Sequence, residues 1–217
     1  MIFSEETAKE IAACLLQVKA IKIQPDTPFT WASGWLSPIY CDNRITLSHP
    51  EARTLIKENL AKVIREKFSA ADLIAGVATA GIAQGALVAD ALELPFAYVR
   101  PEPKKHGMGK QLEGETTSGQ KVVVIEDLIS TGKSSLNALP PLREAGCVIL
   151  GTVATFSYGF DVAEENFKNA SCPLYTLSDY ETLLNVALEN RHIRQHELET
   201  LKQWRKNPEK WGLAIKR

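Results

Sequence analysis

The sequence is short of cysteine, of long apolar runs and of net charge, and each shortage argues against a class of protein. Its four cysteines stand far apart with no C-x-x-C pair, which is typical of thiols in a reducing cytosol. The apolar stretches have strand length, below the ~20 residues of a membrane-spanning helix. A net charge of -1 argues against broad electrostatic capture of nucleic acid or an anionic membrane. We therefore expect a cytoplasmic globular protein with no nucleic-acid or membrane partner.

The order of the apolar segments predicts an α/β fold in which helices flank a central parallel sheet. Strand-length runs at residues 73–77, 96–99, 122–125, 147–156 and 173–177 alternate with helical sequence. The run at 122–125 is continuously β-branched, as expected of a central strand covered on both faces. No repeat or low-complexity linker divides the 217 residues, so we expect a single domain.

Several local signals predict where helices begin and end. Ser4, followed by two glutamates, should cap the first helix, and residues 48–51 (SHPE) match a capping box for the second. The helix after Gly132 should end near Gly146, with an interruption at the prolines 140 and 141. The residues after Ser178 look helical, polar and peripheral, and Trp204 favours docking of this tail onto the domain.

One long polar segment, residues 100–120, breaks the alternation of strands and helices. It holds several glycines and lysines and almost nothing apolar. Loops of this length inside a compact domain are usually functional or disordered. Its position just before the strongest motif favours a mobile lid over a plain surface loop.

Residues 122–134 (VVVIEDLISTGKS) carry the most informative pattern in the chain. The apolar strand should deliver Glu126 and Asp127 to the carboxyl edge of the sheet, where open α/β sheets bind ligands. Small and hydroxylated residues then open a helix, and free N–H groups at such a start suit a phosphate. Carboxylates next to an anion site would repel the anion unless they face neutral hydroxyl groups or a metal. A sugar phosphate offers hydroxyl groups to the carboxylates and a phosphate to the N–H groups.

Three competing interpretations of this region are less satisfactory. A Walker A loop would need glycine where this chain has Asp127. A dinucleotide fingerprint would have to close a strand, whereas Gly107 and Gly109 lie in a polar loop. A plain core strand followed by a capped helix leaves the two adjacent acids unexplained.

The segment resembles the phosphoribosyl-diphosphate (PRPP) motif of type I phosphoribosyltransferases. The resemblance implies that fold, with a base-covering hood at residues 1–47, core sheet and helices at 48–177, C-terminal helices at 178–217, and a mobile loop. It also implies that Glu126 and Asp127 hold the ribose, with Asp127 catalytic, and that residues 128–134 wrap the 5-phosphate. The loop after residues 73–77 resembles the family's diphosphate loop. The PRPP-binding residues implied here are Thr79, Ala80, Glu126, Asp127, Leu128, Ile129, Ser130, Thr131, Gly132, Lys133 and Ser134.

Within this family the chain most resembles the members that act on orotate. Residues 29–44 (FTWASGWLSPIYCDNR) resemble the segment that covers the pyrimidine, which implies orotate contacts from Ser33, Tyr40 and Ser130. Residues 100–107 (RPEPKKHG) resemble the start of the mobile loop, which implies that Arg100, Lys104 and His106 bind PRPP. Lys104 and His106 would be catalytic. The resemblance further implies a homodimer that shares this loop between subunits, and Mg²⁺ held mainly by PRPP without direct protein ligands.

The resemblance therefore predicts transfer of the phosphoribosyl group from PRPP to orotate, giving orotidine 5′-monophosphate and diphosphate in pyrimidine biosynthesis. Some positions depart from the pattern: Ala32 and Leu36 stand where orotate-specific members carry basic residues, and residues 156–159 lack an arginine found in some members. The sequence thus leaves the partner of the orotate carboxylate open. Two alternatives remain, a phosphoribosyltransferase for another nucleobase and a PRPP-sensing regulator on the same fold.

Overall fold

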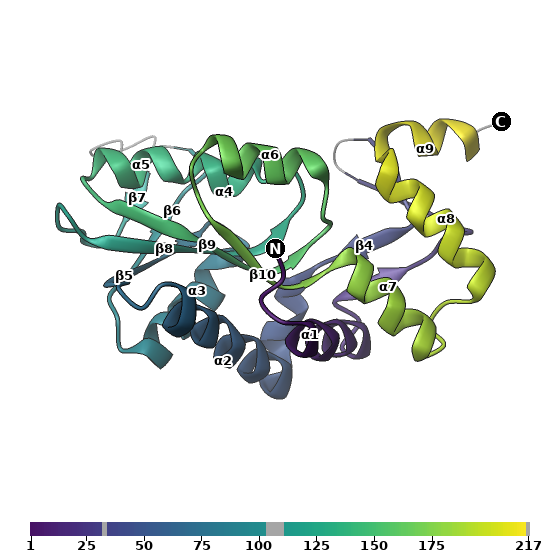
Figure 1. The fold of residues 1–217 in the computed structure, drawn as a ribbon, viewed down its shortest axis with the longest axis horizontal. Helices are drawn as coiled ribbons and strands as arrows, with labels where there is room; N and C mark the ends of the chain where they lie inside the picture. The colour runs from purple at the N-terminus through teal and green to yellow at the C-terminus, as the bar shows by residue number, and fades with distance from the viewer. Residues whose placement is uncertain (32–33, 103–110, 216–217) are drawn as a thin grey trace.

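The protein is built around one six-stranded sheet, shown edge-on in the left half of Figure 1. This computed structural model describes residues 1–31, 34–102 and 111–215, with side chains through residue 211. All neighbouring strands run parallel except the last pair, which is antiparallel. In spatial order the strands are β10 (Leu174–Asp179), β9 (Val148–Ser157), β8 (Lys121–Ile129), β5 (Leu73–Val77), β6 (Phe96–Val99) and β7 (Leu112–Glu113).

Helices cover both faces of this sheet (Figure 1). The lower face in Figure 1 carries α1 (Glu5–Gln17), α2 (Pro50–Lys67) and α3 (Ala80–Leu92). The upper face carries α4 (Lys133–Asn137), α5 (Leu139–Glu144) and α6 (Asp161–Asn169). This arrangement confirms the predicted α/β architecture, because a parallel sheet needs crossover helices that bury both of its faces.

The central strand β8 shows why its sequence is apolar without alternation. Val123 and Ile125 pack into the core beneath α1, α2 and α3, whereas Val122 and Val124 pack into the core beneath α4, α5 and α6. All four side chains are fully buried. A strand enclosed on both faces has no solvent side to keep polar, so its apolar run continues toward the sheet's carboxyl end.

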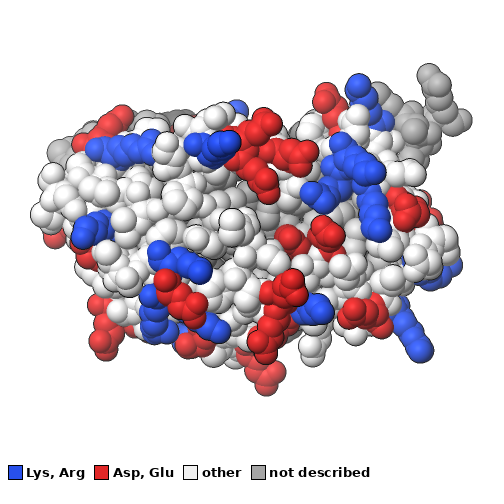
Figure 2. Space-filling view, viewed as in Figure 1, with Lys and Arg blue, Asp and Glu red and all other residues white. Residues whose placement is uncertain are grey.

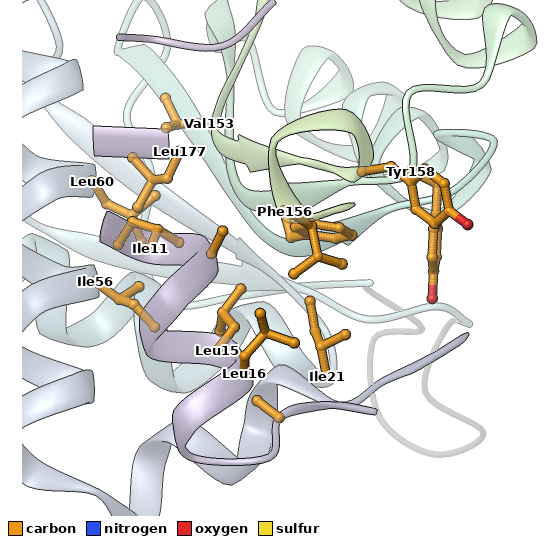
Figure 3. Close-up of a cluster of buried hydrophobic side chains, with 14 of the residues drawn as sticks. Ile11, Leu15, Leu16, Ile21, Ile56, Leu60, Val153, Phe156, Tyr158 and Leu177 are labelled. Carbon is orange, nitrogen blue, oxygen red and sulfur yellow. The ribbon is translucent and has the colours of Figure 1, made fainter. Parts of the chain in front are cut away.

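The larger core joins α1 and α2 to the sheet (Figure 3). Ile11 and Leu15 of α1 lie between Leu60 of α2 and Phe156 of β9, and all of these side chains are fully buried. Tyr158 stands at the end of this cluster, where the aliphatic side chains give way to aromatic rings. The core therefore continues beyond the carboxyl ends of the strands.

Two smaller groups of elements lie beyond that end of the sheet, at the right of Figure 1. The N-terminal group contains two small antiparallel sheets and a 3-10 helix: β1 (Ile21–Ile23), β2 (Phe29–Thr30), β3 (Leu36–Ser37), β4 (Ile39–Cys41) and η1 (Asn43–Ser48). The C-terminal group contains α7 (Tyr180–Glu189), α8 (Gln195–Lys206) and α9 (Pro208–Ile215). In the part of the chain described, no helix combines the length and apolarity needed to cross a membrane.

The helix boundaries confirm some local predictions and correct others. Ser4 caps α1 by accepting a bond from the Thr7 N–H at 3.2 Å, as predicted. The predicted capping box at residues 48–51 is wrong: His49 is the N-cap of α2, without a side-chain bond, because the preceding residues form η1. The helix after Gly132 is split into α4 and α5 around Ala138, since prolines 140 and 141 lack N–H groups for a continuous helix.

The C-terminal helices are less peripheral than predicted. Their outer faces are polar, but Leu201 and Trp204 of α8 are fully buried. The Trp204 ring contacts Trp31, Tyr158 and Tyr180 at centroid distances of 5.5–5.7 Å. The amphipathic period of α8 thus marks a face that packs against the N-terminal group and the end of β9.

Candidate active site

The candidate site forms where β8 ends between two parallel neighbours. The predicted strand, residues 122–125, is too short: β8 continues through Glu126 and Asp127 to Ile129, paired with β9 as far as Ser157. The two acids therefore belong to the last residues of the strand and not to the loop after it. Strand pairing fixes their backbone, which holds both carboxyl groups at the carboxyl edge of the sheet.

The loop after β5 approaches this edge closely. At Gly81, in the first turn of α3, a Cβ atom would lie only 2.5 Å from the carbonyl oxygen of Ile125, so only glycine permits this approach. The contact brings Thr79 and Ala80 opposite the end of β8. The peptide bond between Ala78 and Thr79 is cis.

A cavity of about 320 Å³ lies between these two loops. Two segments that are far apart in the sequence thus share one pocket, as expected for a diphosphate loop and a ribose-phosphate loop. Its lining contains Ala78, Thr79, Ala80, Glu126, Asp127, Leu128, Ser130, Thr131, Gly132, Lys133, Ser134 and Ser135. Of the candidate residues between 126 and 134, only Ile129 is outside this lining, because its side chain is fully buried in the core.

Glu126 is the buried member of the acid pair, only 5% exposed. Its carboxylate accepts a hydrogen bond from the Ser135 hydroxyl at 3.0 Å and another from the Asp127 N–H at 3.1 Å. Burial raises the pKa of Glu126 well above its usual range, and the neighbouring Asp127 carboxyl adds to the increase. A positively charged or hydroxyl-rich ligand would relieve this cost by taking the place of lost water.

Asp127 is less enclosed and is held through its backbone. The side-chain amide of Asn43, fully buried, donates a hydrogen bond to the Asp127 carbonyl at 2.6 Å. Burial also raises the pKa of Asp127, while hydrogen bonding with Glu126 and the charge of Arg44 act in the opposite direction. Because the charge of one carboxylate disfavours ionisation of the other, the pair retains a proton at a higher pH than an isolated acid would.

The small-residue loop after β8 supplies neutral groups beside these acids. Thr131 and Ser130 are partly exposed, Ser134 is exposed, and all three line the cavity. Asn166 of α6 fixes the loop by donating to the Thr131 carbonyl at 3.0 Å. Because α4 has only five residues, a phosphate here would depend on the loop's N–H and hydroxyl groups more than on a helix dipole.

The predicted orotate residues are only partly placed by the structure. Ser33, like Ala32, lies outside the described residues. Tyr40 is 40% exposed, with its ring 5.6 Å from the ring of Phe29, and it does not line the small cavity. Ser130 does line it.

The loop between β6 and β7 carries the remaining candidates. Arg100 forms an ion pair with Glu113 at 3.5 Å, and β7 returns antiparallel to β6. Lys104 and His106 lie outside the described residues, so the structure does not test their predicted roles. Arg100 is not in the lining of the small cavity.

Four residues at the site were not predicted from the sequence. Ser135 bonds Glu126, and Asn43 bonds the Asp127 backbone across 84 residues of sequence. Trp204 and Arg205 of α8 bond the carbonyls of Leu36 and Gly159. Ser135 could have been found as one more hydroxyl in the motif. The other three have no local signal, because their partners are distant in the sequence.

The side chains that line the cavity indicate how a metal ion could bind there. Within the described ranges, no cluster of three or more His, Cys, Asp or Glu side chains could hold a metal ion. The cavity nevertheless offers two carboxyl groups, Glu126 and Asp127, whose burial favours a cation. Such a pair fits Mg²⁺ that keeps most of its oxygen ligands from a phosphate ligand and water.

Comparisons with known proteins agree with this geometry. Residues 45–178 match the family model of the phosphoribosyl transferase domain. The chain is 56% identical over 203 residues to an orotate phosphoribosyltransferase of Cytophaga hutchinsonii, covering 94% of this chain and 97% of the relative. It is 57% identical over 205 residues to the Porphyromonas gingivalis orotate phosphoribosyltransferase, covering 94% and 98% of the two chains.

Solved structures show the same fold. An orotate phosphoribosyltransferase from Aeropyrum pernix superposes with a TM-score of 0.73 at 28% identity, covering 81% of this chain and 96% of that one. Leishmania donovani UMP synthase superposes with a TM-score of 0.78 at 25% identity, covering 92% of this chain and 42% of that longer one.

Proposed function

This chain belongs to the phosphoribosyl transferase family and, within it, to the orotate phosphoribosyltransferases; from that premise we propose how its site works. The enzyme transfers the 5-phosphoribosyl group from PRPP to orotate, giving orotidine 5′-monophosphate and diphosphate in UMP biosynthesis. The observation that supports this reaction at this site is the single cavity formed by the β5–α3 loop and the β8–α4 loop around Glu126 and Asp127.

The reaction is a substitution at the anomeric carbon of the ribose. The bond from that carbon to the diphosphate oxygen breaks, and positive charge develops on the sugar. A bond to a ring nitrogen of orotate then forms, and the proton of that nitrogen passes to the released diphosphate or to water. We propose that Glu126 and Asp127 hold the ribose hydroxyls and lie close to this charge. Ser135 holds a carboxylate oxygen of Glu126, and strand pairing and Asn43 hold the backbone of Asp127, so the acid pair needs little rearrangement as the charge appears.

The two loops bind the two ends of PRPP in this proposal. Residues 128–134 receive the 5-phosphate through backbone N–H groups and the hydroxyls of Ser130, Thr131 and Ser134, with Ile129 contributing its backbone alone. Thr79 and Ala80 receive the diphosphate. Lys133 is exposed beside the same cavity and adds positive charge toward the phosphates. Both ends being fixed, the anomeric carbon is oriented for attack.

We propose that Mg²⁺ binds together with PRPP, held mainly by the diphosphate and ribose oxygens. When bound, the ion would neutralise charge on the leaving diphosphate. Glu126 and Asp127 are the carboxylates in the lining of the cavity in which such an ion would bind with PRPP.

The remaining assignments follow the family resemblance. Ser33, Tyr40 and Ser130 contact orotate beneath the hood. Arg100, Lys104 and His106 act on PRPP from the loop after β6, across the interface of a homodimer. The chain is one domain, with the hood at residues 1–47, the core at 48–177 and the C-terminal helices at 178–217.

The direct test is orotate consumption, followed by its ultraviolet absorbance, with PRPP and Mg²⁺ present and then each omitted. We expect loss of orotate only in the complete mixture, which would also show that Ala32 and Leu36 are tolerated. Asp127→Asn should abolish the loss, whereas Asp90→Asn, which changes an exposed carboxylate of α3, should not. Stabilisation by PRPP without orotate consumption would contradict the base assignment and direct the search to other bases or to a regulator.

A further inference from the structure

Two adjacent residues of α8, Trp204 and Arg205, bond two segments that are unrelated in sequence. The indole N–H of Trp204 donates to the Leu36 carbonyl at 3.2 Å, across 168 residues of chain. The Arg205 guanidinium donates twice to the Gly159 carbonyl, from Nη2 at 2.8 Å and from Nε at 3.3 Å. Leu36 lies in the hood, within the segment 29–44 that resembles the pyrimidine cover, and Gly159 belongs to the β9 turn (residues 157–160).

The β9 turn is coupled to the loop that lines the PRPP cavity. The Tyr158 N–H donates to the Ile129 carbonyl at 3.0 Å, and Ile129 directly precedes Ser130. The turn closes on itself where the Gly159 N–H bonds the Ser157 hydroxyl at 3.0 Å, with Gly159 at φ 63°. A shift of this turn would therefore displace Ser130, which is proposed to contact both orotate and PRPP.

The hood, the β9 turn and the phosphate loop (residues 128–134) each contribute to a cavity of about 740 Å³, most of whose lining comes from α7, α8 and residues 207–209. Trp35 of the hood, Thr131 of the loop, Gly159 of the turn and Arg205 of α8 all line it. Figure 2 shows this region as a shallow hollow, with Lys and Arg side chains gathered over α8 and Asp and Glu side chains over the near end of α6. The α8 helix thus bonds both the hood and the β9 turn across this cavity.

We propose that Trp204 and Arg205 are positioning residues that fix the spacing between the hood and the β9 turn, and through it the affinity for orotate. The inference rests on the proposed function, because it takes the hood as the cover of the base. Neither residue lines the small cavity proposed for PRPP. The carbonyl of Thr131 in the phosphate loop is held by Asn166 of α6 and not by α8.

The aromatic cluster explains why a helix can set this spacing. Trp204 is fully buried and contacts Trp31 of the hood and Tyr158 of the β9 turn at 5.5 and 5.7 Å between centroids. Trp31 in turn donates its indole N–H to the Ile39 carbonyl at 3.2 Å within the hood. The rings of Trp204 and Trp31 are rigid, and each is held by one indole hydrogen bond, so few alternative positions remain for the hood.

The test separates affinity for orotate from affinity for PRPP. Trp204→Phe keeps an aromatic ring and removes the N–H group, and Arg205→Met keeps the length of the stem and removes the guanidinium. We expect the KM for orotate to rise about fivefold in Trp204→Phe, which loses one neutral hydrogen bond, and at least about tenfold in Arg205→Met, which loses two charge-assisted bonds to one carbonyl. The stabilisation of each variant by PRPP should change far less than the KM for orotate, because Asn166 and most of the lining of the small cavity are held independently of α8.

Two further variants serve as controls. Arg205→Lys should recover part of the lost affinity, and Gln195→Ala, an exposed position on the same helix outside the cavity lining, should change nothing. Unchanged KM for orotate in a folded Trp204→Phe or Arg205→Met variant overturns the inference. The inference is also overturned if the affinities for orotate and PRPP fall by the same factor and the melting temperature drops. That result would show that the residue has only a structural role. If the unaltered enzyme consumes no orotate, the proposed function fails first, and the failure is visible before any variant is made.

Discussion

At the scale of single residues, the carboxyl group of Glu126 is expected to favour PRPP binding while it lowers the stability of the folded protein. It is 5% exposed and its pKa is raised by burial and by Asp127, so its charged form is unfavourable in the folded protein. The folded state then binds protons more tightly than the unfolded state. Stability should therefore fall as pH rises above the usual glutamate range of about 4.3.

We predict that Glu126→Gln raises the melting temperature at pH 8, because an uncharged amide removes this burial cost. Each kcal/mol gained should appear as about 2–4 °C in a protein of this size. Below pH 4 the advantage should disappear, since the native carboxyl group is then neutral as well. PRPP affinity should drop by about 10- to 100-fold, because hydrogen bonds to a charged acceptor are lost.

The measurement is a series of thermal unfolding curves from about pH 3 to about pH 8, with and without PRPP. Glu164→Gln is the matched control, since Glu164 is exposed on α6. A variant that is no more stable than the unaltered protein at pH 8 would contradict the assignment of a buried, unfavourable charge.

At the scale of elements, the phosphate loop depends on how closely α4 and α6 pack. Gly132 precedes α4 at φ 77°, and a Cβ atom there would lie 2.7 Å from the ring of Phe167 in α6. The residue is thus restricted twice, by a left-handed backbone and by a neighbouring ring. Gly119 has a similar φ of 90°, but no atom lies within 4 Å of the point that a Cβ atom would occupy there.

We predict that Gly132→Ala destabilises the protein by about 1–3 kcal/mol for the backbone, with a further cost from the collision. It should also weaken PRPP binding, because the loop must move to accommodate the methyl group. Gly119→Ala should show the backbone cost alone and leave PRPP binding intact. Urea unfolding and PRPP titration of both variants make the comparison. Equal effects of the two substitutions on PRPP binding would refute the role of the contact with Phe167.

At the scale of the whole molecule, the proposed sharing of the β6–β7 loop between subunits can be tested by mixing inactive variants. Lys104→Ala alone should lower turnover far more than it weakens PRPP binding, and Asp127→Asn should be inactive. If Lys104 acts in the neighbouring site, a mixed dimer contains one site with both residues intact. Random mixing should then recover about a quarter of full activity, as expected for a symmetric dimer.

Mixing is done by unfolding and refolding the two variants together, and activity is measured as orotate loss. Each variant refolded alone is the control. No recovery, in a mixture shown to contain mixed dimers, would mean that the loop acts in its own subunit's site.

The sequence by itself determined the fold class and marked the acid pair and the small-residue loop after β8 as the candidate site. The strands at residues 73–77 and 122–125 could be predicted without tertiary information. Burial on both faces of a parallel sheet requires a continuous apolar run, which is visible in the local sequence. The same holds for Glu126, Asp127 and the small residues after them, which are adjacent in the chain. Thr79 was implicated only by the family resemblance; it lines one cavity with Glu126 because the neighbouring parallel strands β5 and β8 end at the same edge of the sheet.

Only the tertiary structure decided which distant residues hold this site in place. The bonds from Asn43 to Asp127 and from Trp204 to Leu36 join positions 84 and 168 residues apart. Nothing in the local sequence marks either pair, because a buried asparagine or tryptophan has the same neighbours in sequence whatever it contacts in space. The packing of α8 selects the partners of Trp204, and the position of η1 selects the partner of Asn43. A buried N–H or carbonyl must be paired, and the groups within reach are those that the fold brings there.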